Sequence, residues 1–220
     1  MSLLEKLMIK KTVDEPLINT NININAKLQV YLAGPDVFMP NCIDIGNYKK
    51  QLLAAAGYIG HFPLDPLIPD FKPNQETAYN ISKGNETSMD QCQIILANMT
   101  PWHGSPSMDV GTAFEVGYMS CKAKFRPLDT LIIGYYEGDV EQDYSKRVAQ
   151  YYNHQIIEQK DGRVTDITGV TLENFTLCEN LMIPAAIKKT GGDIFLSFEE
   201  AVNNISLLWK SKACIAKNAY

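Results

Sequence analysis

The chain has few of the features that mark a secreted or membrane-bound protein. Its five cysteines among 220 residues are odd in number and scattered, with no Cys-x-x-Cys pair, which argues against a disulfide framework or a zinc site. No apolar run approaches the roughly 20 residues that span a bilayer. The amino terminus also lacks a signal-peptide pattern, because Glu5 and Lys6 interrupt its short apolar patch. We therefore expect a cytoplasmic protein.

Positive charge and cofactor motifs are also scarce. The formal net charge is −5, and no run of lysine and arginine offsets it, so we expect no binding to nucleic acid or to an anionic membrane. The histidines His61, His103 and His154 lack metal-ligand spacing. Gly-x-Gly-x-x-Gly and a P-loop lysine are absent as well. We expect neither a metal ion nor a cofactor.

The composition favours one globular domain. Hydrophobic residues make up 45% of the chain and charged residues 20%, which is ordinary for a folded protein. Residues 1–26 are polar, rich in asparagine and without clear periodicity, so we interpret them as an amino-terminal extension. Residues 27–220 show neither a linker nor an internal repeat, and we assign them to a single domain.

Short apolar runs alternate with segments of helical periodicity along this domain. Strands are predicted at 28–33, 58–62, 93–98 and 130–135, helices at 43–56, 76–91, 109–123, 140–152, 178–189 and 198–212, and an irregular or hairpin segment at 154–172. This order predicts an α/β fold with an open parallel sheet and helices on both faces, flavodoxin-like or Rossmann-like.

Glu115 is the most unusual residue of the predicted ligand-binding edge. In open parallel sheets, ligands bind at the carboxyl ends of the strands, where residues 31–38, 98–109 and 111–115 are expected to lie. Glu115 stands in the apolar run Ala113-Phe114-Glu115-Val116-Gly117, so its carboxylate needs partners or pays for desolvation. A purely structural alternative is an ion pair with Lys122 or Arg126.

Four motifs in the same order along the chain carry a family resemblance. They are Val30-Tyr31-Leu32-Ala33-Gly34-Pro35, Ala97-Asn98-Met99-Thr100-Pro101-Trp102, the run from Ser107 to Tyr118, and Asn180-Leu181-Met182. Together they resemble the nucleoside 2-deoxyribosyltransferase family, with the closest similarity over about residues 28–136. Four ordered motifs are far more specific than any one of them.

The resemblance implies a role for each matching residue. Glu115 would be the nucleophile that attacks C1′ of the deoxyribose and holds the sugar covalently. Tyr31 would orient that carboxylate, and Asp109 would bind the 5′-hydroxyl. Asn180 and Met182 would enter the site of a neighbouring subunit, which predicts a homo-oligomer. Without the resemblance, Tyr31 would be interpreted as a core aromatic and Asp109 as a helix N-cap.

Other residues of these motifs are expected to contact substrate. Asn85 would face the nucleobase, at a position where some family members carry Asp; an amide is a poor general acid, so Asp36 is a candidate to help protonate the base. Gly34 lies in the first of the loops. Trp102 would either stack on the base or pack against the sheet.

The predicted function is transfer of 2-deoxyribosyl groups between nucleobases in nucleoside salvage, with 2′-deoxynucleosides and free bases as partners and retention of configuration. The main alternative is an N-glycoside hydrolase of (deoxy)nucleosides or deoxynucleoside 5′-monophosphates. A phosphoribohydrolase and a non-catalytic nucleoside-binding domain are further alternatives. Base preference, tolerance of a 2′-hydroxyl, the ratio of transfer to hydrolysis, subunit number and the roles of residues 1–26 and 136–176 stay open.

Overall fold

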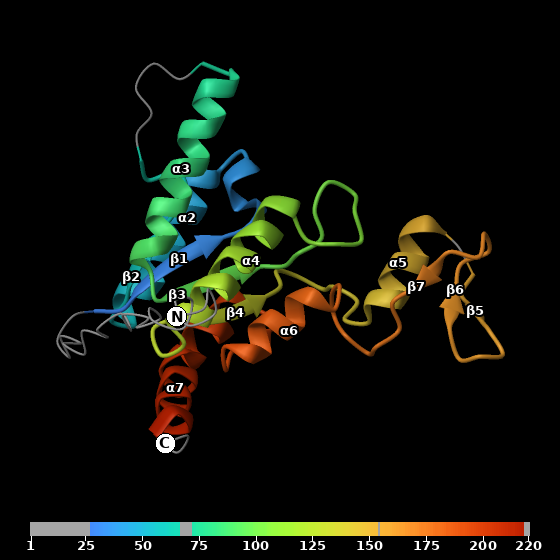
Figure 1. Ribbon diagram of the computed structural model, residues 1–220. Coiled ribbons are helices and arrows are strands. Elements are labelled where there is room, and N and C mark those ends of the chain that lie inside the picture. Colours follow the sequence, from blue (N-terminus) through green and yellow to red (C-terminus); the bar gives the residue numbers. More distant parts are fainter. Residues whose placement is uncertain (1–26, 67–71, 154, 218–220) are drawn as a thin grey trace, which may run out of the picture.

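A computed structural model describes residues 27–66, 72–153 and 155–217 (Figure 1), so the expected extension at residues 1–26 lies outside the described residues. The described chain contains a parallel sheet of five strands in the order β2-β1-β3-β4-β8. The strands are β1 (Gln29–Ala33), β2 (Ile59–His61), β3 (Ile94–Asn98), β4 (Leu131–Tyr135) and β8 (Ile194–Phe195). This order is the flavodoxin-like arrangement, so the predicted α/β fold is confirmed.

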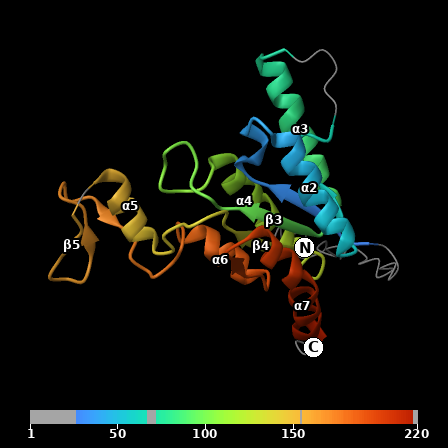
Figure 2. The same cartoon turned by 180° about the vertical axis from the view of Figure 1, so that it is seen from behind.

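Helices cover both faces of the sheet, as Figures 1 and 2 show. They are α2 (Cys42–Ala55), α3 (Gln75–Gln91), α4 (Val110–Phe125), α6 (Met182–Lys189) and α7 (Phe198–Lys217). Strand residues alternate between two apolar cores: Val30 and Leu32 pack with α2 and α7, whereas Tyr31 and Ala33 pack with α3, α4 and α6. The period of two thus sends Tyr31 to the α4 face.

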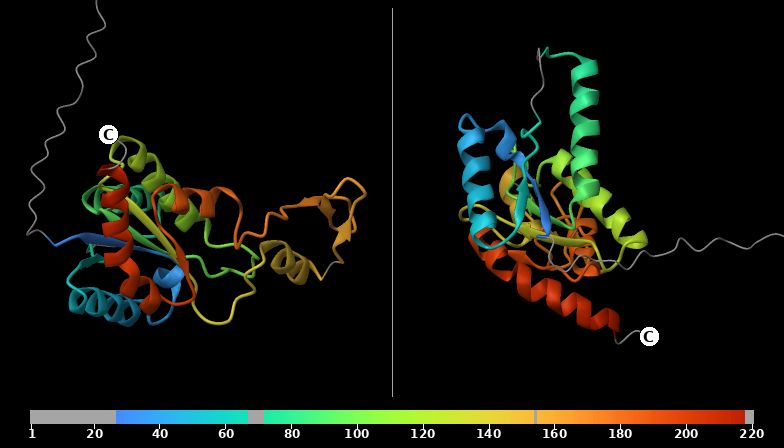
Figure 3. Two further views of the ribbon diagram at one scale, coloured as in Figure 1. Left: turned by 90° about the horizontal axis from the view of Figure 1, so that it is seen from below. Right: turned by 90° about the vertical axis from the view of Figure 1, so that its left-hand side faces the viewer.

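A small arm extends from one end of the sheet (Figure 3). It contains α5 (Tyr144–Tyr152) and an antiparallel sheet of β5 (Ile157–Glu158), β6 (Val164–Thr165) and β7 (Thr171–Leu172). The sequence predicted the start of α5 four residues too early, and it predicted an irregular or hairpin segment at 154–172, where three short antiparallel strands are found. Strands of two residues give too little alternation to be recognised from sequence.

Two further elements and one helix boundary differ from the sequence-based expectations. The 3-10 helix η1 (Pro35–Phe38) and strand β8 were not predicted, and α6 begins at Met182 instead of residue 178. Residues 178–181 are held outside the helix by side-chain contacts described below. No helix in the described ranges is long and apolar enough to cross a membrane.

Strand β8 approaches β4 closely because Gly192 has no side chain. A Cβ at Gly192 would lie 1.7 Å from the carbonyl oxygen of Ile132, a contact that only a backbone shift relieves. We expect Gly192→Ala to lower the free energy of unfolding by about 2 kcal/mol or more. In the matched Gly84→Ala variant, the new methyl group meets nothing within 4 Å in α3. It should leave stability unchanged or raise it by about 0.5–1 kcal/mol. Urea unfolding checks both values, and equal effects would contradict this account.

Candidate active site

The candidate site lies where β1 and β3 end. In the observed strand order these two neighbours form the switch point, because the chain leaves β1 toward one edge of the sheet and β3 toward the other. Their carboxyl-end loops therefore diverge and leave room for a ligand. Helix α4 follows the loop after β3, and its Glu115 contacts Tyr31 of β1.

Tyr31 and Glu115 are brought together from 84 positions apart in the sequence. The Tyr31 hydroxyl donates a hydrogen bond of 2.6 Å to Glu115 Oε1. Tyr31 is fully buried in the middle of β1, so its ring is fixed, and Glu115 lies in the second turn of α4. The alternative partner Lys122 instead donates to the carbonyl oxygens of Met89, Asp90 and Cys92.

The environment of Glu115 makes its ionised form costly. Burial raises the pKa of Glu115 to about 7; the Tyr31 hydrogen bond opposes this rise, and the negative charge of Asp109 adds to it. Burial and the charge of Glu115 also raise the pKa of Tyr31 above its usual range, so Tyr31 remains a neutral donor. Glu115 is thus poised between its acid and carboxylate forms near neutral pH.

Asp109 is the N-cap of α4. Its Oδ2 accepts from the backbone nitrogen of Thr112 at 2.9 Å and from the Thr112 hydroxyl at 3.1 Å. These bonds fix the carboxylate at the positive end of the helix. Both use Oδ2, so within the described ranges Oδ1 has no hydrogen-bond partner and is left to accept one from a ligand.

Asp36 belongs to a separate polar cluster on the α2 side of the sheet. Its Oδ2 pairs with Lys49 Nζ at 3.0 Å, and Asn98 Nδ2 donates to both of its oxygens at 3.3 and 3.4 Å. Lys49 also donates to the Tyr135 hydroxyl at 2.9 Å and pairs with Glu137 at 3.1 Å. Both oxygens of Asp36 thus have hydrogen-bond partners in this cluster, and its expected role in protonating the base stays a prediction.

Lys49 was not identified from the sequence as a member of this polar cluster, although its place in the helical pattern indicated a buried lysine. Lys49 lies between Ile45 and Leu53 at steps of four, on the face of α2 that packs against the sheet. A lysine on such a face needs a buried partner. Breaking a buried pair such as Lys49–Asp36 by removing one member typically costs about 3–5 kcal/mol.

A pocket of about 620 Å³ opens beside this cluster. Trp102 forms part of its wall and stacks on Phe38, with ring centroids 5.5 Å apart and planes 20° apart. Gly34 allows the close approach of the two loops, since a Cβ there would lie 2.6 Å from Asn98 Cβ. Among the described residues, the pocket lining includes Asp36 and Trp102 but not Tyr31, Glu115 or Asp109.

The remaining predicted site residues are Asn85, Asn180 and Met182. Asn85 is half-buried in α3. Asn180 donates to Glu173 Oε1 of the same chain at 2.6 Å, and Met182 is 67% exposed at the start of α6. In the part of the chain that the structure describes, no group of three or more His, Cys, Asp or Glu side chains is placed to hold a metal ion.

The fold and the site together define an α/β protein with a desolvated carboxylate at the switch point of a parallel sheet. A family model for nucleoside 2-deoxyribosyltransferases matches residues 30–182, well over half of the chain. The chain belongs to this family, and the resemblance seen in the sequence motifs is confirmed.

Three relatives illustrate the similarity. An uncharacterised protein of Schizosaccharomyces pombe is 28% identical over 171 residues, which cover 77% of this chain and 81% of the relative. The structure of a 2-deoxyribosyltransferase from Leishmania mexicana is 26% identical with a TM-score of 0.57, covering 83% of this chain and 97% of that one. A conserved protein from Enterococcus faecalis V583, at 16% identity, TM-score 0.52 and coverage of 83% and 99%, shares the fold.

The Tyr31–Glu115 bond predicts how Glu115 titrates. We expect the Glu115 carboxyl carbon to titrate near pH 7 in a ¹³C NMR experiment on glutamate-labelled protein. In Tyr31→Phe the midpoint should rise, because the lost hydrogen bond stabilises the carboxylate. Tyr118→Phe is the matched control on α4: its hydroxyl donates to Asp90, so its loss should not move the midpoint. An unchanged midpoint in Tyr31→Phe would show that the bond is absent in solution.

Proposed function

We propose that this protein transfers 2-deoxyribosyl groups between nucleobases through a covalent glycosyl-enzyme intermediate on Glu115, with retention of configuration. The observation that carries the proposal is the Tyr31–Glu115 pair at the switch point of a chain that belongs to the nucleoside 2-deoxyribosyltransferase family. The proposed substrates are 2′-deoxynucleosides and free bases.

The proposed reaction has two displacements at C1′. A Glu115 carboxylate oxygen bonds to C1′ as the C1′–N bond breaks, and the base leaves with the electron pair of that bond and gains a proton. A nitrogen of a second base then bonds to C1′, the C1′–O bond breaks to release the carboxylate, and the second base loses a proton to solvent. Two inversions give net retention, and the nearby anion stabilises the oxocarbenium-like transition state of each step.

Tyr31 and Asp109 have separate tasks in this reaction. The Tyr31 hydroxyl holds one Glu115 oxygen, which leaves the other to face C1′. Asp109 Oδ1 would accept from the 5′-hydroxyl of the sugar while Oδ2 keeps its bonds to Thr112. A 5′-phosphate at the same position would meet the negative charge of Asp109, so free nucleosides are favoured over nucleotides.

Protonation of the leaving base is assigned to solvent. Asn85 offers an amide, which donates hydrogen bonds but does not give up a proton near neutral pH. Asp36 has both oxygens bonded to Lys49 and Asn98 on the other side of the sheet. Asn85 would then contact the base without taking part in the chemistry, whereas Trp102 lines the pocket beside Asp36 and stacks on Phe38.

An exposed apolar surface beside Glu115 supports a homo-oligomer with a shared site. Val110 is 85% exposed and Phe114 58% exposed on the first turns of α4, and Met182 lies exposed at the start of α6, a helix that packs against α4. Apolar side chains gathered in this way mark an interface. A second copy would cover them and bring its Asn180 and Met182 to the site.

The nucleophile is tested by Glu115→Gln. We expect wild-type protein given deoxyadenosine and cytosine to form deoxycytidine, and the variant to lose at least about a thousandfold in both transfer and hydrolysis, since it lacks the attacking carboxylate. Chromatography of the nucleosides measures both products. Free deoxyribose without a new nucleoside would support the hydrolase instead, and substantial turnover by Glu115→Gln would remove Glu115 from the mechanism.

A thermal melt controls for misfolding of this variant. Because the folded pKa of Glu115 lies above its ordinary value, Glu115 destabilises the wild type as pH rises from about 4.5 through about 7. Glu115→Gln removes that cost, so its Tm should exceed that of the wild type at pH 8 and approach it at pH 4.

The shared site is tested by mixing two inactive variants. Glu115→Gln and Asn180→Ala each damage a different half of the site. After unfolding and refolding together, half of the dimers should pair one subunit of each kind, and one of the two sites in such a dimer is intact. We therefore expect about a quarter of wild-type activity. Lack of recovery, in a mixture that size-exclusion chromatography shows to be oligomeric, would place Asn180 and Glu115 of one site in one subunit.

A further inference from the structure

We infer that a buried ion pair, Arg147–Glu179, positions the two residues expected to bind the sugar 5′-hydroxyl. The inference rests on the proposed function and assigns positioning roles to two residues that the family resemblance did not single out. Neither residue would touch substrate, and both would act through Asp109 and Asn180.

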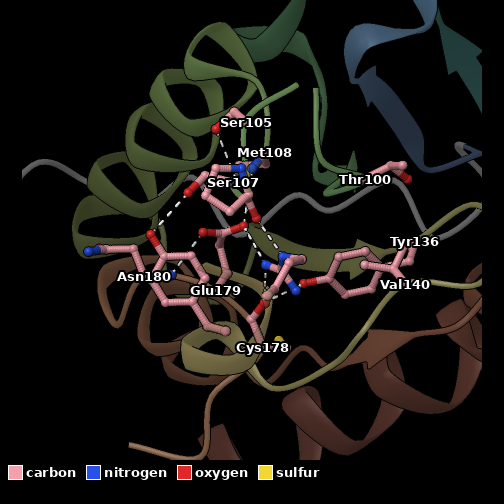
Figure 4. A network of polar contacts seen from close by, with 12 residues as sticks. Thr100, Ser105, Ser107, Met108, Tyr136, Val140, Cys178, Glu179 and Asn180 are labelled. Atoms are coloured by element: carbon pink, nitrogen blue, oxygen red, sulfur yellow. Dashed lines mark hydrogen bonds and ion pairs between the residues drawn. The ribbon is translucent and has the colours of Figure 1, made fainter. Parts of the chain in front are cut away.

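Glu179 connects the two segments of the chain that carry Asp109 and Asn180. Its Oε2 accepts from the backbone nitrogen of Met108 at 3.1 Å, and its Oε1 accepts from the backbone nitrogen of Asn180 at 3.0 Å (Figure 4). Met108 directly precedes Asp109, and Asn180 directly follows Glu179. One carboxylate thus sets the chain next to Asp109, which belongs to the site of its own subunit, and next to Asn180, which would enter the site of the neighbouring subunit.

Arg147 holds that carboxylate and the surrounding backbone. Its Nη2 donates to Glu179 Oε2 at 3.1 Å and to the carbonyl of Cys178 at 2.7 Å. Its Nη1 donates to the carbonyl of Glu141 at 2.6 Å, and its Nε donates to the carbonyl of Pro106. A single guanidinium therefore joins the loop before α4, the start of the arm and the segment before α6.

The Arg147–Glu179 pair is shielded from water, so water molecules cannot replace the contacts between the two side chains. The side chains of Arg147 and Glu179 are 7% and 1% exposed, and the Arg147 guanidinium lies 5.9 and 5.5 Å from the ring centres of Tyr136 and Tyr144. Burying these charges is costly unless the donors find partners, and four of the five N–H groups of the Arg147 guanidinium donate to the acceptors around it. The arrangement is rigid because any shift would leave a buried charge unpaired.

The arm supports both segments that Arg147 and Glu179 connect. Arg147 lies on α5, the helix of the arm, and Ser107 contacts Tyr144 of the same helix at 3.0 Å. The loop at residues 99–108 and the segment at 177–181 therefore rest on one support. The inserted residues 136–176 would thus support Asp109 in the site of their own subunit and present Asn180 to the site of the neighbouring subunit.

The test compares substrates with and without the 5′-hydroxyl. In Arg147→Lys, the ammonium keeps the charge but cannot reach the same four acceptors. We expect kcat/KM for a 2′-deoxynucleoside to fall about 10-fold to 100-fold, the usual effect of losing a charge-assisted hydrogen bond. For the 2′,5′-dideoxynucleoside, which lacks the hydroxyl, kcat/KM should change less than about threefold.

Two further variants guard this result. Glu179→Gln keeps the shape of the side chain and should show the same selective loss to a smaller degree. Arg163→Lys makes the same change at an exposed arm residue that pairs with Asp161, and both substrates should be unaffected. Equal losses on the two substrates in Arg147→Lys would overturn the positioning role, because general damage to the fold does not discriminate between them.

Hydrogen exchange tests whether Arg147 couples the two segments, and it does not depend on enzyme activity. In Arg147→Lys, backbone amides of residues 100–109 and 177–182 should exchange faster together, while the central strands keep their protection. Faster exchange in only one of the two segments would contradict the coupling. A wild type with neither transfer nor hydrolysis would refute the proposed function, and the exchange result would then decide alone whether Arg147–Glu179 couples the segments.

Discussion

The site depends on the cost of keeping a carboxylate away from water. Glu115 lies in an apolar stretch of α4. The Tyr31 hydroxyl donates a hydrogen bond that stabilises its ionised form. An exposed glutamate would be a weak nucleophile surrounded by water, and a fully paired one would be inert. The fold leaves Glu115 between these extremes, because β1 buries Tyr31 completely and the Asp109 N-cap fixes where α4 begins.

The sheet keeps two polar clusters apart at the same edge. Alternation along β1 sends Tyr31 toward α4, whereas Asp36, beyond the end of the strand, turns toward Lys49 of α2. Lys49 forms ion pairs with Asp36 and Glu137 on the α2 side of the sheet, and its positive charge is not directed at Glu115. A cation bonded to Glu115 would lower its pKa and, in the proposed mechanism, would weaken its attack on C1′. The Lys49 cluster instead braces the loops after β1, β3 and β4.

Local patterns in the sequence determined most of the fold but only part of the site. Apolar runs of five residues and helical periodicity were enough to predict β1, β3, β4 and their helices, because each signal lies within a short window. The Tyr31–Glu115 contact spans 84 positions, and only the family resemblance indicated it. The Arg147–Glu179 pair left no such trace, since neither residue stands in an unusual local context. Its backbone bonds also explain why α6 begins at Met182, later than periodicity alone suggested.

A carboxylate that performs two displacements must attack well and then leave well. A strongly basic oxygen favours the attack on C1′, and a weakly basic one favours release of the sugar to the second base. A pKa of about 7 for Glu115 is a compromise between these demands near neutral pH. In the proposed mechanism, water competes with the second base for the same intermediate, so the balance between transfer and hydrolysis would depend on how well the site is covered. The exposed Val110 and Phe114 show that one protomer leaves that edge open. In the proposed enzyme, the second subunit therefore supplies the cover that makes transfer, and not hydrolysis, the outcome.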